Sequence, residues 1–232
     1  MRNIARELLE DLADIIYPRL CGACDNAPVR KSPFCIDCLA ELPHTGYHLV
    51  PENPFEMQFW GRVPITAGAA LYYFIPGGRT QRLLHNLKYR GRRDLATRLG
   101  EFYAFQLCES GRFTSIDLII PVPLHWRKRH QRGYNQSEDF ARGLSAGLDV
   151  PYKKTVLRRS GSGKSLTSMS REERAEEVTG MFVVRQSSLV ADKHVLLVDD
   201  VLTTGATLEE CARVLIGAGA KISLCTLACG RI

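Results

Sequence analysis

The sequence VLLVDDVLTTGAT at residues 195–207 constrains the fold more than any other feature of this chain. Its first four residues are apolar, which is typical of a buried central strand. Asp199 and Asp200 follow at the C-terminal end of that strand. In open α/β sheets, ligands bind beyond the carboxyl ends of the strands, so the sequence predicts a binding site here. The loop that follows, which opens a helix, consists of Thr203, Thr204, Gly205, Ala206 and Thr207.

Small residues in this loop would let the backbone close around an anion. Its free N–H groups and the positive end of the helix dipole would then supply the donors. Asp199 and Asp200 would accept hydrogen bonds from the vicinal hydroxyls of a ribose whose 5′-phosphate fills the loop. The alternative is that the two carboxylates cap a turn and that Thr-Thr-Gly starts an ordinary helix. The unbroken order of strand, acids, loop and helix favours the ribose-phosphate site.

A nucleotide triphosphatase would also place acids at the end of a strand, and it would require a P-loop. The segment GSGKS at residues 161–165 is similar to one. The motif requires glycine five positions before the Gly-Lys-Ser glycine, and Arg158 stands there. The sequence therefore excludes the P-loop interpretation.

Four cysteines near the N-terminus form two C-x2-C pairs separated by ten residues. Two such pairs can present four thiolates in a tetrahedron, which suits a structural zinc ion. A redox pair or disulfides are the alternatives, and both fit poorly with two matched pairs in a reducing compartment. Such a segment could serve nucleic-acid binding, partner docking or scaffolding. The predicted zinc ligands are Cys21, Cys24, Cys35 and Cys38, and the other four cysteines are expected to be small hydrophobes in apolar settings.

Apolar runs alternate with helical patterns from about Val63 onward, which predicts an α/β fold with a mostly parallel sheet flanked by helices. Helical spacing also covers residues 1–17, where acidic residues interrupt any signal-like apolar run. We expect an N-terminal helix and zinc-binding segment over 1–45, a linker or packed-down extended segment over 46–62, and the main domain over 63–232. No run of residues is long and apolar enough to span a bilayer, so we expect a cytoplasmic protein.

Basic residues gather in two stretches of the chain, which carries a formal net charge of +6. One is a loop over 124–132 after the strand IDLII, where Arg132 and Asn135 flank a strand-to-helix turn suited to phosphate. The other covers 79–98, where Tyr89 lies among basic side chains. Basic residues beside aromatic rings are typical of single-stranded nucleic-acid binding, although a basic face that only increases solubility is an equal alternative.

The strand and loop at 195–207 resemble the PRPP-binding motif of type I phosphoribosyltransferases. Together with the paired C-x2-C motifs, Leu87-Lys88-Tyr89, Pro121-Val122-Pro123 and RGYNQ, they resemble the ComF family of competence proteins over nearly the whole chain. The resemblance implies a phosphoribosyltransferase-like domain with a zinc-binding segment, acting on incoming single-stranded DNA together with competence-machinery proteins. It also implies ribose contacts from Asp199 and Asp200, phosphate contacts from residues 203–207, and a phosphate-binding role for Lys88.

The chain departs from the family pattern in the segment over 160–180, which corresponds to the mobile hood over the active site of the transferases. Lys164 or Ser165 stands near the place of a glutamine, and Glu177 stands where the family tends to have asparagine. Arg174 and Phe182 match the pattern. The chemistry of this segment is therefore the least transferable part of the resemblance.

Three functions are compatible with the sequence. The first is a phosphoribosyltransferase of unknown acceptor, which would use PRPP with Mg²⁺ and stabilise developing charge by preorganised groups. The second is a non-catalytic module that binds single-stranded DNA and retains the pocket as a sensor or a vestige. The third is a regulatory PRPP-binding protein. The motif contains no general base, and we interpret His125 and His130 as solvent-exposed loop residues.

Overall fold

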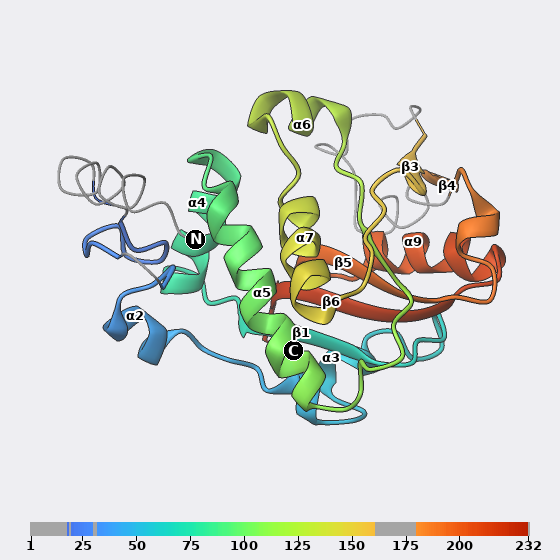
Figure 1. The fold of residues 1–232 in the computed structure, drawn as a ribbon, viewed down its shortest axis with the longest axis horizontal. Helices are drawn as coiled ribbons and strands as arrows, with labels where there is room; N and C mark the ends of the chain where they lie inside the picture. The colour runs from blue at the N-terminus through green and yellow to red at the C-terminus, as the bar shows by residue number, and fades with distance from the viewer. Residues whose placement is uncertain (1–17, 19, 30–31, 161–179, 232) are drawn as a thin grey trace, which may run out of the picture.

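The computed structural model describes residues 18, 20–29, 32–160 and 180–231, and its centre is a four-stranded parallel sheet (Figure 1). The strands lie in the order β1-β6-β5-β2, and all three neighbouring pairs are parallel. The predicted α/β fold is therefore confirmed. The strands are β1 (Gly68–Tyr73), β2 (Leu118–Pro121), β5 (His194–Leu202) and β6 (Lys221–Cys229).

Helices flank this sheet. The chain crosses it in opposite directions between β1 and β2 and between β5 and β6, so right-handed crossovers place the intervening helices on opposite faces. None of the helices in the described part of the chain is long and apolar enough to cross a membrane. The main helices are α4 (Arg79–Tyr89), α5 (Arg93–Glu109), α6 (Trp126–Arg132), α7 (Gln136–Leu148) and α9 (Ala206–Gly217).

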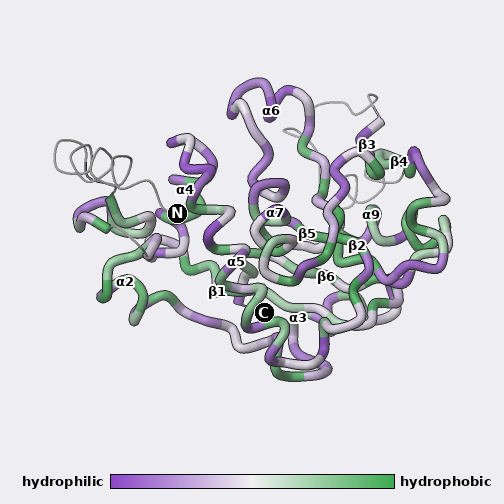
Figure 2. Tube along the Cα trace, in the orientation of Figure 1, coloured by the Kyte–Doolittle hydropathy of each residue, from purple (hydrophilic) through white to green (hydrophobic). Residues whose placement is uncertain are grey.

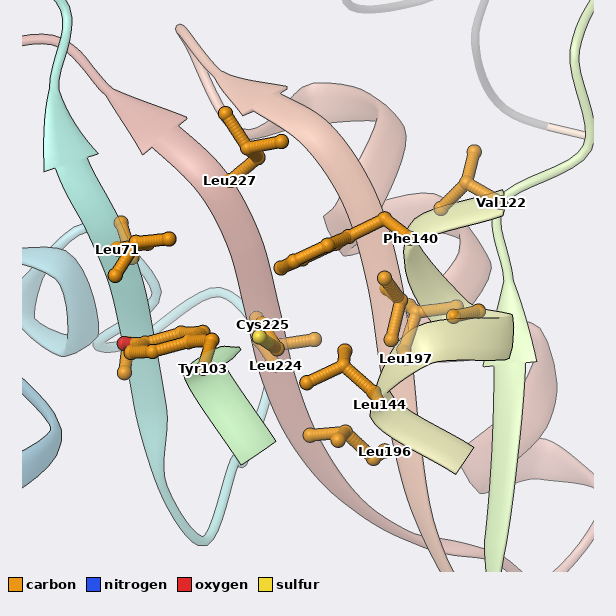
Figure 3. Close-up of a cluster of buried hydrophobic side chains, with 14 of the residues drawn as sticks. Leu71, Tyr103, Val122, Phe140, Leu144, Leu196, Leu197, Leu224, Cys225 and Leu227 are labelled. Atoms are coloured by element: carbon orange, nitrogen blue, oxygen red, sulfur yellow. The ribbon is translucent and has the colours of Figure 1, made fainter. Parts of the chain in front are cut away.

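The core between α5, α7 and the sheet is closely packed and apolar (Figure 3). Tyr103 of α5 and Phe140 of α7 lie over side chains of β1, β6 and β5, among them Leu71, Leu224 and Leu197. Cys211, Cys225 and Cys229 are buried in the core, as the sequence predicts for small hydrophobes. Cys108 is an exception, because it lies on the exposed face of α5.

Helices α5 and α7 approach each other closely enough for their backbones to touch, and glycine makes this possible. A Cβ atom added to Gly143 would lie 1.9 Å from the carbonyl oxygen of Thr97, and one added to Gly100 would lie 2.3 Å from that of Phe140. No side chain can occupy either position unless the helices separate. Because α7 begins at the functional site, this packing also determines where the site residues of α7 lie.

We expect Gly143→Ala to lower the free energy of unfolding by about 1–3 kcal/mol, since the added methyl group must push two packed backbones apart. Gly217→Ala is the matched control, because a Cβ at this helical position meets nothing within 4 Å. Thermal or urea unfolding of the two variants measures the difference. Equal stability of both variants would contradict the close approach of the helices.

Residues 46–62 were expected to be a linker or a packed-down extended segment. They pack down, but with two short helices in place of extended chain: η1 (Tyr47–Leu49) and α3 (Pro54–Met57). Phe55 and Phe59 are fully buried there. The side-chain amide of Asn53 donates to the carbonyl oxygens of Tyr47, Val50 and Gly68 at 2.9–3.0 Å. This buried amide joins the segment to β1, which the polar, proline-containing sequence did not indicate.

The two basic stretches also differ from their predicted forms. The expected long helix over 79–107 is divided into α4 and α5 at Gly91, whose φ of +67° breaks the helix. The expected basic loop over 124–132 contains α6. The ring of His125 accepts a hydrogen bond from the backbone N–H of Arg127 at the start of α6, and left-handed Gly133 ends the helix. Figure 2 shows α6 as a strongly hydrophilic projection.

A small antiparallel pair of strands, β3 (Leu157–Arg159) and β4 (Phe182–Val184), lies beside the sheet. The strand predicted over YKKTVLRR is thus limited to its last part. Predictions for the N-terminal helix over 1–17 and for the hood, including GSGKS, Lys164, Ser165, Arg174 and Glu177, fall outside the described residues.

Candidate functional site

The two acids at the end of β5 are held by neighbours from different elements. The hydroxyl of Ser137, in the first turn of α7, donates to Oδ1 of Asp199 at 2.9 Å. The backbone N–H of Asp200 donates to the same oxygen at 2.8 Å. The ammonium group of Lys88, near the end of α4, lies 3.1 Å from Oδ2 of Asp200. The carboxylates predicted for the site are therefore fixed in orientation before any ligand arrives.

The two carboxylates differ in their electrostatic surroundings. Burial and the adjacent charge of Asp200 raise the pKa of Asp199 to about 7, although the hydrogen bonds from the Asp200 N–H and Ser137 and the charge of Lys88 oppose the rise. Asp200 has the direct ion pair with Lys88. Asp199 is consequently the group whose charge changes near neutral pH.

The loop after β5 forms a small recess of about 40 Å³ at the start of α9. Gly205 precedes the helix with a φ of +79°, a conformation that favours glycine. Arg62 supports the loop from outside: its guanidinium donates to the carbonyl oxygen of Thr204 at 3.2 Å and forms an ion pair with Glu209. The predicted residues line the recess together, and they are Asp199, Thr203, Thr204, Gly205, Ala206 and Thr207.

A larger cavity of about 530 Å³ adjoins this recess, and Asp199, Thr203 and Thr207 line both. The cavity brings together residues that lie far apart in the sequence, and we call it the ribose-phosphate cavity after the ligand that the sequence predicts for it. Every side chain predicted for the site lines this cavity, apart from loop residues 204–206 and the four cysteines. The predicted residues that line it are Lys88, Arg132, Asn135, Asp199, Asp200, Thr203 and Thr207.

Arg132 and Asn135 have different roles in this cavity. Asn135 caps α7: its side chain accepts from the N–H of Ser137 and donates to the carbonyl oxygen of Val122 at 2.9 Å. Its side chain therefore positions the start of the helix. Arg132 stacks on the ring of Tyr89 at 5.5 Å and donates to Gln136 at 3.1 Å. Among the described residues, the Nε of Arg132 and Nε2 of Gln136 are buried without a hydrogen-bond partner, so this wall offers donors to a ligand.

Three residues of the site had not been identified from the sequence. Ser137 follows RGYNQ directly, and its position at the first turn of a helix after a strand was the available signal. Arg159 lines the cavity from β3, and no carboxylate contacts it in the described part of the chain. Arg62 lies 142 residues before the loop carbonyl that it contacts, and no local pattern points to it.

A second cavity of about 810 Å³ continues from the first between α6 and the β3–β4 pair, and Arg159 and His125 line both. We call it the basic groove. Trp126 lies at its edge with 64% of its side chain exposed. No carboxylate occurs among its described lining residues. Its cationic residues are Arg129, Lys154, Arg158, Arg159 and Arg185, of which Lys154 forms an ion pair of 2.8 Å with Glu138.

The basic residues of the other stretch, 79–98, largely face acids. Lys88 contacts Asp200, Arg90 contacts Asp25, and Arg93 forms two hydrogen bonds of 3.0 Å with the buried carboxylate of Asp139. Charges that are already matched contribute little attraction for a phosphate backbone. Of the two basic stretches, the one beside α6 retains its positive charge within the described part of the chain, since no carboxylate lines the groove there.

The four predicted metal ligands lie together, and their sulfur atoms are all within 4.8 Å of one another. Cys24 Sγ and Cys35 Sγ are 3.9 Å apart, close to the ~3.8 Å edge of a tetrahedron with Zn–S bonds of about 2.3 Å. The backbone N–H of Asn26 donates to the thiolate of Cys24 and lowers its pKa to about 7, despite partial burial. The cluster can therefore hold a metal ion such as zinc.

This geometry defines a class: a phosphoribosyltransferase-type α/β domain that carries a four-cysteine segment. The profile described as "Phosphoribosyl transferase domain" matches residues 135–231. Among solved structures, an adenine phosphoribosyltransferase is 17% identical, with a TM-score of 0.39, covering 63% of this chain and 75% of that chain.

Curated relatives identify the family within this class. The chain is 30% identical over 206 residues to the DNA utilization protein YhgH of Shigella flexneri, covering 87% of this chain and 86% of that protein. It is 26% identical to Competence protein F of Haemophilus influenzae, covering 84% and 83%. Competence protein ComFC of Bacillus subtilis is 27% identical, covering 62% and 57%. The chain belongs to the ComF family, as the sequence motifs predicted.

Proposed function

We propose that this protein binds PRPP, or a closely related ribose-phosphate ligand, in the ribose-phosphate cavity and acts in DNA uptake during natural competence. The observation that carries the proposal is the convergence at one point of two oriented carboxylates and an anion-sized recess at a helix start. The names of the curated relatives support the role in competence.

Each part of the ligand has a matching part of the site. The 5′-phosphate fills the recess, where the N–H groups of residues 203–207 and the dipole of α9 favour an anion. Asp199 and Asp200 accept hydrogen bonds from the ribose hydroxyls. The pyrophosphate lies toward Lys88 and Arg132, and a Mg²⁺ ion carried by PRPP neutralises part of its charge.

Transfer to an acceptor would depend mainly on positioning and electrostatics, since the described lining residues include no carboxylate other than Asp199 and Asp200. His125 lines the cavity, and desolvation together with nearby arginines lowers its pKa, which leaves the ring neutral. His130 lies exposed on α6. Binding of PRPP therefore has stronger support than turnover.

Calorimetric titration with Mg-PRPP tests the proposal. We expect Asp200→Asn to weaken binding about tenfold to a hundredfold, because it replaces a charged acceptor of the ribose hydroxyls. Asp192→Asn is the matched control, since Asp192 is exposed, distant from the site, and in a left-handed conformation that asparagine tolerates. Absence of heat from the wild-type protein would refute the proposed ligand.

The basic groove favours a second function, the binding of single-stranded DNA. Its cations would follow a phosphate backbone, and the exposed ring of Trp126 would stack on a base. This function is compatible with an active or an inactive ribose-phosphate site, because the two cavities adjoin without coinciding.

We expect Trp126→Ala to weaken binding of labelled single-stranded DNA about fivefold or more in fluorescence anisotropy, since stacking contributes roughly 1–3 kcal/mol per base. Trp60→Ala is the control, because Trp60 has a similar exposure of 57% and lines a different cavity. The affinity should also fall steeply with salt. Equal affinities of the two variants, or binding that is insensitive to salt, would contradict a role for the groove.

A further inference from the structure

Helix α4 lies between the four-cysteine cluster and the ribose-phosphate cavity. Near its start, the guanidinium of Arg79 donates to the sulfur of Cys38 and forms an ion pair of 2.7 Å with Glu41. Further along, the buried amide of Asn86 donates to the carbonyl oxygen of Gly22 at 3.0 Å and to the carboxylate of Asp25. Helix α4 is thus attached to the cysteine segment near both of its ends, through side chains on one face of the helix.

The end of the same helix belongs to the ribose-phosphate cavity. Lys88 forms the ion pair with Asp200, and the ring of Tyr89 supports the guanidinium of Arg132. The carbonyl oxygen of Leu87 accepts a hydrogen bond from the hydroxyl of Tyr134, just before α7. Three consecutive residues of α4 therefore contact three different parts of the site.

The two sets of contacts lie on different faces of the helix. Asn86 and Lys88 are two positions apart, and side chains at this spacing point away from each other. Asn86 has 2% of its surface exposed and faces the cysteine segment, whereas Lys88 faces the acids of β5. A shift of the cysteine segment must therefore move α4, and with it the charge that neutralises Asp200.

We propose that the four-cysteine segment positions the ribose-phosphate site through α4, with Asn86 as the positioning residue for Lys88. The inference rests on the proposed ribose-phosphate ligand and on a metal in the cysteine cluster. It assigns this segment a role in ligand affinity in addition to its own folding. Loss of the metal, or of the hydrogen bonds of Asn86, then weakens ligand binding while the sheet stays folded.

Because the charge of Lys88 lowers the pKa of Asp199, this coupling should be measurable as a change in that pKa. The groups that face Asp199 are Asp200 on the same strand, Lys88 from α4, the hydroxyl of Ser137 from α7, and the thiol of Cys211 from α9. Burial keeps the pKa of Cys211 well above its usual value, so this thiol stays neutral. Lys88 is the cation of this set, and its displacement moves the pKa of Asp199 further upward.

The test measures the dissociation constant of Mg-PRPP from pH 5.5 to 8.5 for the wild type, Asn86→Ala, Lys88→Met and the double variant. We expect Asn86→Ala to weaken binding about threefold to tenfold and to move the midpoint of the pH profile upward, in the direction of Lys88→Met. Adding Asn86→Ala to Lys88→Met should change neither quantity further, because both act through one contact. Arg82→Ala, on the exposed face of α4, is the matched control and should behave as the wild type.

Metal-chelated wild-type protein should reproduce the Asn86→Ala profile, and Arg79→Gln gives a second variant if Asn86→Ala is poorly folded. Additive effects of Asn86→Ala and Lys88→Met, or an unchanged pH midpoint, would overturn the proposal. Hydrogen exchange without ligand separates the two inferences. Faster exchange of residues 87–89 in Asn86→Ala supports the positioning role even where Mg-PRPP fails to bind, and unchanged exchange refutes it.

Discussion

Removal of the metal from the four-cysteine cluster should unfold residues 20–29 and 32–42 while the four-stranded sheet stays folded. Apart from its contacts with α4 and a few buried side chains such as Phe34 and Leu42, this segment has little other stabilisation. Its helix α2 (Ile36–Glu41) is six residues long with no side-chain cap, and Ile36 is 86% exposed. Structural zinc in comparable small sites contributes about 10–16 kcal/mol of apparent binding free energy, which exceeds what these few buried residues can supply.

Metal analysis and hydrogen exchange measure this effect together. Purified protein should contain about one zinc ion per chain, and chelation should abolish protection of the segment but not that of β5 and β6. Cys38→Ser should reproduce the effect of chelation. Cys108→Ser is the control, because Cys108 is exposed on α5 and far from the cluster in sequence. Metal-free protein with full protection of the segment would contradict the metal site.

The parts of the fold that the sequence predicted well are those with local causes. The strand β5, its two acids and the glycine that begins α9 are contiguous, so one short pattern specifies all of them. The cysteine cluster needed only two matched pairs, because the members of each pair are close in sequence and the second pair lies at the start of α2. The mostly parallel sheet followed from apolar runs that alternate with helical patterns.

The parts that the sequence could not predict depend on contacts between distant segments. The amide of Asn53 contacts Gly68, and the guanidinium of Arg62 reaches Thr204, although neither pair is close in sequence. The net charge of each basic stretch also depends on contacts with distant residues. Basic residues over 79–98 and 124–132 look equivalent along the chain, and only the fold shows that acids neutralise most of the first set.

Binding of the ligand should also depend strongly on pH. Two ribose hydroxyls donate hydrogen bonds, so the ligand prefers ionised Asp199. Because the pKa of Asp199 is raised to about 7, binding below that pH must first release a proton. The affinity for Mg-PRPP should therefore fall by up to tenfold for each pH unit below about 7 and be level above it, giving roughly thirtyfold weaker binding at pH 5.5.

The sign of this dependence distinguishes it from other titrations near the site. Protonation of His125, which lines the cavity, would strengthen binding of an anion at low pH and give the opposite slope. Asp199→Asn should remove the step near pH 7 and leave only the titration of the ligand phosphate, near pH 6. Asp200→Asn should move the step to lower pH, because it removes the neighbouring charge that raises the pKa of Asp199.

The same raised pKa predicts how the free protein responds to pH. The folded state holds the proton of Asp199 more tightly than the unfolded chain, where the pKa of aspartate is about 3.9. The contribution of this group to stability is thus present at low pH and is lost as the pH rises from about 4 through 7. Mg-PRPP should offset this loss above pH 7, where it binds best, so thermal stabilisation by the ligand should increase with pH. A step in affinity that survives in Asp199→Asn would assign the titration to another group.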